Sequence, residues 1–247
     1  MAPYVRLVNR SAVENAWKAF HALFRNARTC DQPLRCPGSG VILMDVRIEM
    51  TRAQYAVLAE AAMAEGDTEA YLSFRGGTQP YVGSDQEISD DFELGPHFQV
   101  NLDINPLEQL DEGDRCPQSE YVLYSPRGAW GILVSVEWHA IAVGSASFRS
   151  RLVASSQFSD SVQSFLKYWK DSRDRLRGRT GWIPDFIENV YGRIEGVKRS
   201  LELNERVGFA LISCEAVQRS TGIFTTRLNR RQRWEGGLIT LLAGCDA

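Results

Sequence analysis

Apolar residues recur every three to four positions near the start of the chain, which is the spacing of an amphipathic helix. Ser11 and Glu14 have the spacing of a capping box, so we predict a helix from Ser11 to about residue 27. Thr51 and Gln54 form a second such pair, which predicts a second helix that begins at Thr51.

Apolar and polar residues alternate elsewhere, as they do along strands with one buried face. A turn signal, Pro126–Gly128, separates two short apolar runs, and a third run follows closely. We expect the three runs to form a meander of antiparallel strands. The strands predicted in this way lie at 41–50, 69–74, 98–105, 120–125, 129–136 and 138–143.

Helical spacing returns after about residue 145, and Pro184 would stand in the first turn of one of these helices. The predicted helices lie at 148–155, 160–177 and 181–192, with another in 194–213, where 207–213 is alternatively a strand, and a last one at 230–244. We therefore expect an α+β fold in which residues 1–150 form a mainly antiparallel sheet with helices. Residues 151–247 form a mostly helical part, either as a second domain or packed with the first as one.

Charge is distributed unevenly along the 247 residues. Lys and Arg against Asp and Glu number 9 and 8 in residues 1–75, 2 and 12 in residues 76–148, and 17 and 11 in residues 149–247. The net charges are thus +1, −10 and +6. No Lys or Arg occurs between Gly76 and Asp114. Such asymmetry bears on the partners of a protein and not on its fold.

The densest acidic stretch is "SDQEISDDFELG", residues 84–95. Acidic clusters speed association with basic proteins, and an aromatic residue among them suits an apolar anchor. We therefore expect a non-catalytic intracellular bacterial protein that binds a basic protein partner, as an immunity protein, an antitoxin or a regulatory protein would. A solvated acidic loop without a partner is the alternative. The expected contact residues are Asp85, Glu87, Asp90, Asp91, Phe92 and Glu93.

Cysteine usage and hydropathy indicate the compartment. The five cysteines are scattered and odd in number, which favours reduced thiols in the cytosol over a disulfide framework. No apolar leader begins the chain, and no apolar run reaches the roughly 20 residues of a membrane-spanning helix. The excess of Arg (24) over Lys (4) is typical of GC-rich bacterial genes. A cytoplasmic protein without membrane attachment is expected.

Local motifs for metals and cofactors are missing. Cys30 and Cys36 lack the spacing of a zinc site, and residues 101–112 resemble a calcium loop only until Pro106, where a glycine is required. The chain has no phosphate-binding or dinucleotide-binding glycine motif. The basic stretches 170–179 and 227–233 suit solvated faces better than nucleic-acid binding. We expect no metal and no cofactor.

Two stretches carry an enzymatic alternative. "YLSFRGG" (71–77) ends a strand with an arginine, and "QSEYVLYSP" (118–126) contains Gln-x-Glu. They resemble two motifs of mono-ADP-ribosyltransferases, in which the arginine holds the dinucleotide and the glutamate orients the reacting groups. The resemblance covers about 16 residues and implies a transferase that uses Arg75, Gln118 and Glu120. The Ser-Thr-Ser strand of that family has no counterpart here.

His139 is a further candidate for catalysis. Glu137 lies two residues before it, so in a strand both side chains would face the same side. A carboxylate beside an imidazole tunes its pKa, which makes the two an acid–base candidate. A polar pair on a solvent-facing side is the other interpretation.

Overall fold

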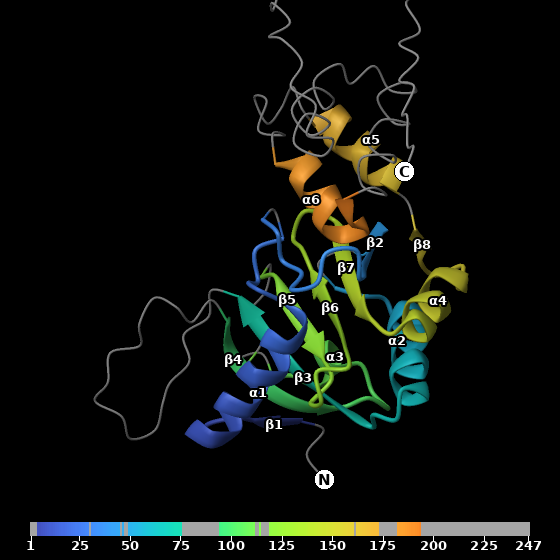
Figure 1. Cartoon of the computed structure of the whole chain (residues 1–247). Helices are drawn as coiled ribbons and strands as arrows, with labels where there is room; N and C mark the ends of the chain where they lie inside the picture. The colour runs from blue at the N-terminus through green and yellow to red at the C-terminus, as the bar shows by residue number, and fades with distance from the viewer. Residues whose placement is uncertain are drawn as a thin grey trace, which may run out of the picture.

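The computed structural model describes residues 4–29, 31–44, 46, 49–75, 94–111, 114, 119–160, 162–172 and 182–193. Within these residues the chain forms one antiparallel sheet of eight strands with helices against both faces, so the predicted α+β class with a mainly antiparallel sheet is confirmed (Figure 1). The strands are β1 (Tyr4–Arg6), β2 (Gly40–Met44), β3 (Glu69–Arg75), β4 (Leu94–Asn101), β5 (Tyr121–Tyr124), β6 (Trp130–Val134), β7 (His139–Gly144) and β8 (Ser159–Asp160). The helices are α1 (Arg10–Leu23), α2 (Arg52–Ala64), α3 (Pro106–Gln109), α4 (Ala146–Ala154), α5 (Val162–Ser172) and α6 (Ile183–Tyr191).

The strand order is β1-β4-β3-β5-β6-β7-β2-β8. Strands β5, β6 and β7 pair in sequence, which confirms the predicted meander. Strand β2 pairs with β7 and β8, whereas β3 lies between β4 and β5. The stretch β2-α2-β3 therefore carries the chain across three intervening strands.

Both faces of the sheet are buried, so its strands are nearly continuous apolar runs. In β2, Val41 and Leu43 face the layer of α2 and α4, while Ile42 and Met44 face α1, α5 and α6. This division follows from the two-residue period of a strand. Burial on both faces explains why the middle strands lack the polar–apolar alternation of a half-exposed sheet.

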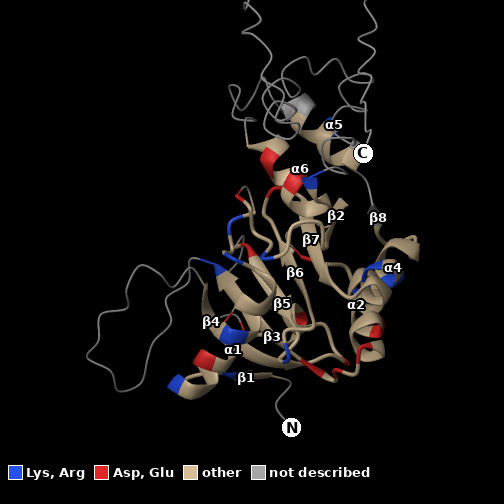
Figure 2. Cartoon of the chain, in the orientation of Figure 1, with Lys and Arg blue, Asp and Glu red and all other residues tan. Residues whose placement is uncertain are grey.

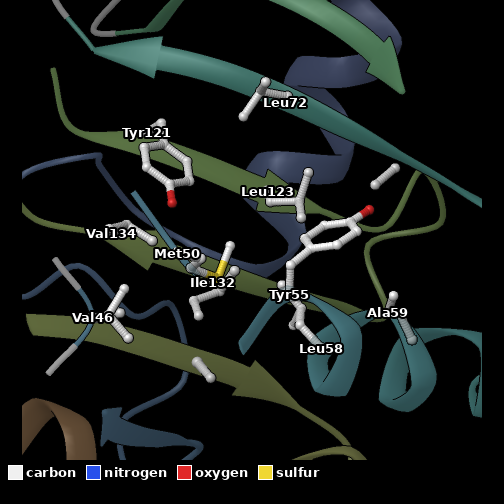
Figure 3. Close-up of a cluster of buried hydrophobic side chains, with 14 of the residues drawn as sticks. Val46, Met50, Tyr55, Leu58, Ala59, Leu72, Tyr121, Leu123, Ile132 and Val134 are labelled. Carbon is white, nitrogen blue, oxygen red and sulfur yellow. The ribbon is translucent and has the colours of Figure 1, made fainter. Parts of the chain in front are cut away.

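Helix α2 shows how local sequence and packing agree. Thr51 and Gln54 form the predicted capping box at its start. Tyr55, Leu58 and Ala59 turn toward the sheet and lie over Leu72, Leu123 and Ile132 (Figure 3). The hydroxyl of Tyr55 donates a hydrogen bond to the carbonyl oxygen of Leu102 at 3.1 Å, so the phenol is buried with a partner.

Two predicted boundaries, the start of α1 and the end of β2, need correction. Helix α1 begins at Arg10 and not at Ser11, because Asn9 caps it by accepting a hydrogen bond from the Ser11 amide at 2.9 Å. Glu14 instead pairs with Arg10. Strand β2 ends at Met44, well before residue 50.

The strand predicted at 98–105 is displaced toward the N-terminus. It begins at Leu94 and ends at Asn101, whose side chain accepts a hydrogen bond from the Asp103 amide and so starts a turn. Asn105 likewise accepts from the Leu107 amide and caps α3. Local side-chain bonds thus end a strand that the alternation alone would continue.

In the C-terminal part, α5 buries Val162, Phe165, Leu166 and Trp169 on its inner face. Helix α6 carries Pro184 in its first turn as predicted. Both helices pack in the same apolar cluster as α1 and the sheet. Residues 194–247 lie outside the described residues, so a mostly helical C-terminal part and a domain division near residue 150 stay predictions.

Candidate functional site

The predicted partner-binding residues lie outside the described residues, but the structure fixes where their segment begins and ends. Asp85, Glu87, Asp90, Asp91, Phe92 and Glu93 all belong to residues 76–93, which we call the acidic segment. Arg75 ends β3 and Leu94 begins β4, and these two residues are register partners in adjacent strands. Both ends of the acidic segment are therefore attached at neighbouring points of one sheet end.

A buried carboxylate secures this point. The Arg75 amide donates a hydrogen bond to the Glu120 carbonyl oxygen at 2.8 Å, and the Arg75 guanidinium forms an ion pair with the Glu120 carboxylate. The guanidinium is partly exposed, whereas the Glu120 side chain is buried. The structure thus brings together the two residues that the transferase-like motifs singled out, while Gln118 lies outside the described residues.

Two hydroxyl groups complete the surroundings of Glu120. Oε1 accepts a hydrogen bond from Thr29 Oγ1 at 2.8 Å and another from Ser135 Oγ at 3.0 Å, and both hydroxyl residues are buried. We call Thr29, Arg75, Glu120 and Ser135 the Glu120 cluster. A buried carboxylate is tolerated when donors replace its water, and three donors do so here. These contacts join the connection after α1 to the end of β3, the start of β5 and the end of β6.

His139 lies in a different environment from the one that the sequence suggested. Strand β7 begins at His139, and Glu137 lies in the preceding turn. His139 Nδ1 faces the Glu137 backbone carbonyl oxygen at 3.4 Å, and the ring packs edge-on against Phe165 and Phe186. Burial lowers the pKa of His139 to about 4, despite the opposing effect of that carbonyl. The imidazole is therefore neutral at pH 7 and has no exposed surface.

Sequence reasoning missed a second buried polar group. Ser73 Oγ lies 2.6 Å from His97 Nδ1 and 3.0 Å from the Tyr124 hydroxyl, and Ser73 and His97 are register partners. The available signal was a serine and a histidine inside apolar strands. Serine beside histidine is a nucleophile–base arrangement, but both residues are at most 1% exposed. Burial lowers the pKa of His97 to about 4, against the raising effect of the Leu94 backbone.

Acidic residues that follow β4 are partly neutralised within the fold. Asp114 pairs with Arg6 at 2.9 Å, and Glu108 pairs with Arg52 at 2.9 Å. Asp111 accepts a hydrogen bond from the Tyr4 hydroxyl. In Figure 2 the strands are almost entirely tan, and the charged residues lie mainly on helices and connections. Part of the negative charge that follows β4 is therefore already paired within the fold.

Metal ligation finds no support in the described part of the chain. No group of three or more His, Cys, Asp or Glu residues gathers there with metal-binding geometry. Asn101 and Asn105, which the calcium-like spacing included, instead serve the turn and the cap described above. Of the helices described, none has the length and apolar character to cross a bilayer.

No protein-family model, curated protein or solved structure matches this chain.

Proposed function

We propose that this chain is a non-catalytic intracellular bacterial protein that binds a basic protein partner through its acidic segment. The observation that carries the proposal is the attachment of this segment at adjacent register positions, Arg75 and Leu94, where the Glu120 cluster holds the sheet end. Immunity proteins, antitoxins and regulatory proteins are the kinds of protein that use such a surface.

The charge of the acidic segment supports this function. Residues 76–93 contain five acidic residues and no Lys or Arg, which is a net charge of −5 over 18 positions. The two residues that flank the segment, Arg75 and Leu94, lie at one end of the sheet. A concentrated negative potential raises the association rate with a cationic surface and disfavours acidic partners.

The bonding of the candidate catalytic groups also supports a binding role. Glu120 uses its carboxylate for Thr29, Ser135 and Arg75. A general acid, base or orienting carboxylate must instead reach a substrate. His139 is buried among aromatic rings. The contacts of Glu120 and His139 in the described residues therefore support a role in stabilising the fold.

Charge reversal tests the proposal. We expect the wild-type chain to capture a partner of high isoelectric point from its native host, and Asp90→Lys with Asp91→Lys to lose at least tenfold in affinity for the identified partner. The matched control reverses Glu14 and Glu60, which are exposed on α1 and α2 and change the net charge by the same amount. Equal affinity of the acidic-segment variant and the control would exclude the proposal.

A second candidate function is nucleotide-dependent group transfer, which the direct contact of Arg75 with Glu120 favours. Under this alternative the wild-type chain modifies an acceptor when it is given NAD, and Glu120→Gln abolishes modification while the dinucleotide still binds. The absence of any modification by the wild-type chain would remove this candidate and leave the binding function standing.

A further inference from the structure

The turn between β6 and β7 holds a tryptophan in an unusual backbone conformation. The Ser135 amide donates to the His139 carbonyl oxygen at 2.9 Å, which leaves a connection of Val136, Glu137 and Trp138. Trp138 has φ 64°, in the left-handed region. Short hairpin connections of this kind commonly place glycine or asparagine at that position, because a bulky side chain is strained there.

The indole of Trp138 is also exposed. Its exposed fraction is 48%, whereas the aromatic residues of α5 and α6 are buried or half-buried. It stacks on Tyr168 of α5, with ring centroids 6.2 Å apart and planes inclined by 17°. The strained backbone of Trp138 costs stability and its exposed indole gains little from burial, so folding alone does not favour a tryptophan at this position. Such outliers concentrate at binding sites.

The turn is linked to the base of the acidic segment. Ser135, where the turn starts, donates a hydrogen bond to Glu120, and Glu120 pairs with Arg75, the residue that precedes the segment. The acidic Glu137 adjoins Trp138 in the turn. The aromatic surface of Trp138 and the residues that flank the acidic segment thus belong to the same end of the sheet.

We propose that Trp138, supported by Tyr168, is the anchor for an arginine side chain of the basic partner. This inference rests on the proposed function and specifies how the partner is recognised. Arginine stacks its planar guanidinium on aromatic faces and is less strongly hydrated than lysine. Tryptophan, tyrosine and arginine are also the residues in which the binding energy of interfaces is concentrated.

Two peptides of equal charge test the anchor on the full chain: nona-arginine and nona-lysine, titrated at low and moderate salt. We expect the wild-type chain to bind nona-arginine roughly fivefold more tightly than nona-lysine. Trp138→Gly should remove this preference and leave nona-lysine binding unchanged. Glycine accepts the left-handed conformation, so this variant should keep the melting temperature of the wild type. Trp138→Phe should retain most of the preference.

Two further variants separate this inference from the proposed function. Tyr168→Leu leaves the turn backbone intact and should reduce the arginine preference. The Asp90→Lys, Asp91→Lys variant should weaken binding of both peptides equally. Two results would overturn the anchor alone. The first is an arginine preference that survives in Trp138→Gly. The second is a wild type that binds both peptides equally through the acidic segment. Failure of the wild type to bind either peptide would overturn the anchor and the acidic surface together.

Discussion

Thr29 Oγ1 donates a hydrogen bond to Glu120 Oε1 at 2.8 Å, although 91 positions separate the two residues in the chain. Both side chains are buried, and the bond joins the connection after α1 to the residue that precedes β5. The same carboxylate pairs with Arg75, where the acidic segment leaves the sheet. A bond inside the fold therefore helps to hold the base of the proposed binding surface.

Thr29→Val keeps the shape of the side chain and removes the donor. We expect the free energy of unfolding in urea to fall by about 1–2 kcal/mol, because a buried acceptor loses a charge-assisted partner. Thr68→Val is the matched control at an exposed position and should change stability by less than about 0.5 kcal/mol. Equal losses in the two variants would show that the Thr29–Glu120 bond contributes nothing specific.

Acid should destabilise the protein through its two buried histidines. Burial lowers the pKa of His97 and of His139 from 6.5 to about 4. The unfolded chain then binds protons that the folded chain does not, so stability is complete above pH 6.5 and declines until about pH 4. The loss should reach roughly 3 kcal/mol for each histidine.

His139→Phe tests the contribution of one histidine. Phenylalanine suits the ring contacts with Phe165 and Phe186 and carries no titrating group. Urea unfolding across the same pH range should show a shallower decline for this variant, with little change at neutral pH. His21→Gln is the control, because it removes a histidine of α1 that is only half-buried. If the free energy of unfolding of His139→Phe declined with pH as steeply as that of the wild type, the proposed contribution of His139 would be wrong.

Asp67 should affect the stability of the protein at a lower pH than the two histidines do. Burial alone would raise the pKa of Asp67, but hydrogen bonds from Arg127, Ser125 and Trp130 lower it below its usual 3.8. Its stabilising effect is therefore present above pH 3.8 and is lost as the pH falls further. We expect Asp67→Asn to be less stable at neutral pH and to converge with the wild type in acid. Asp103→Asn is the control at an exposed position.

Gly131 of β6 packs closely against the C-terminal end of α1. A Cβ atom there would lie 2.7 Å from Phe24 Cε2 and 3.0 Å from Leu23 Cδ1. Gly131→Ala should therefore lower the free energy of unfolding by about 1–3 kcal/mol. Phe24→Leu in the same chain removes one of the clashing atoms, so the double variant should lose less than the sum of the single losses. Strict additivity would argue against a direct clash.

The helices were the most predictable part of the fold. The Thr51–Gln54 capping box and Pro184 in the first turn of α6 depend on residues within one turn of each other, so the sequence displays them directly. The start of α1 was misplaced by one residue because Asn9 and Ser11 are both good capping residues. Only the observed hydrogen bond shows which one caps the helix.

The candidate site was predictable only in part. Arg75 and Glu120 were singled out by short motifs, and they do form a pair. Their motifs say nothing about Thr29 and Ser135, which reach the same carboxylate from distant parts of the chain. The Ser73–His97 contact likewise depends on the pairing of β3 with β4, and pairing partners cannot be read from either strand alone.

By itself the sequence indicated most of the helices and strands, though not all of their bounds, the meander of three strands, and the concentration of negative charge between Gly76 and Asp114. These properties depend on composition and on neighbours close in the chain. The tertiary structure alone decided the strand order, the enclosure of Glu120, the burial of His139 and the exposure of Trp138. Each of these depends on contacts between segments far apart in the chain, which only the folded arrangement brings together.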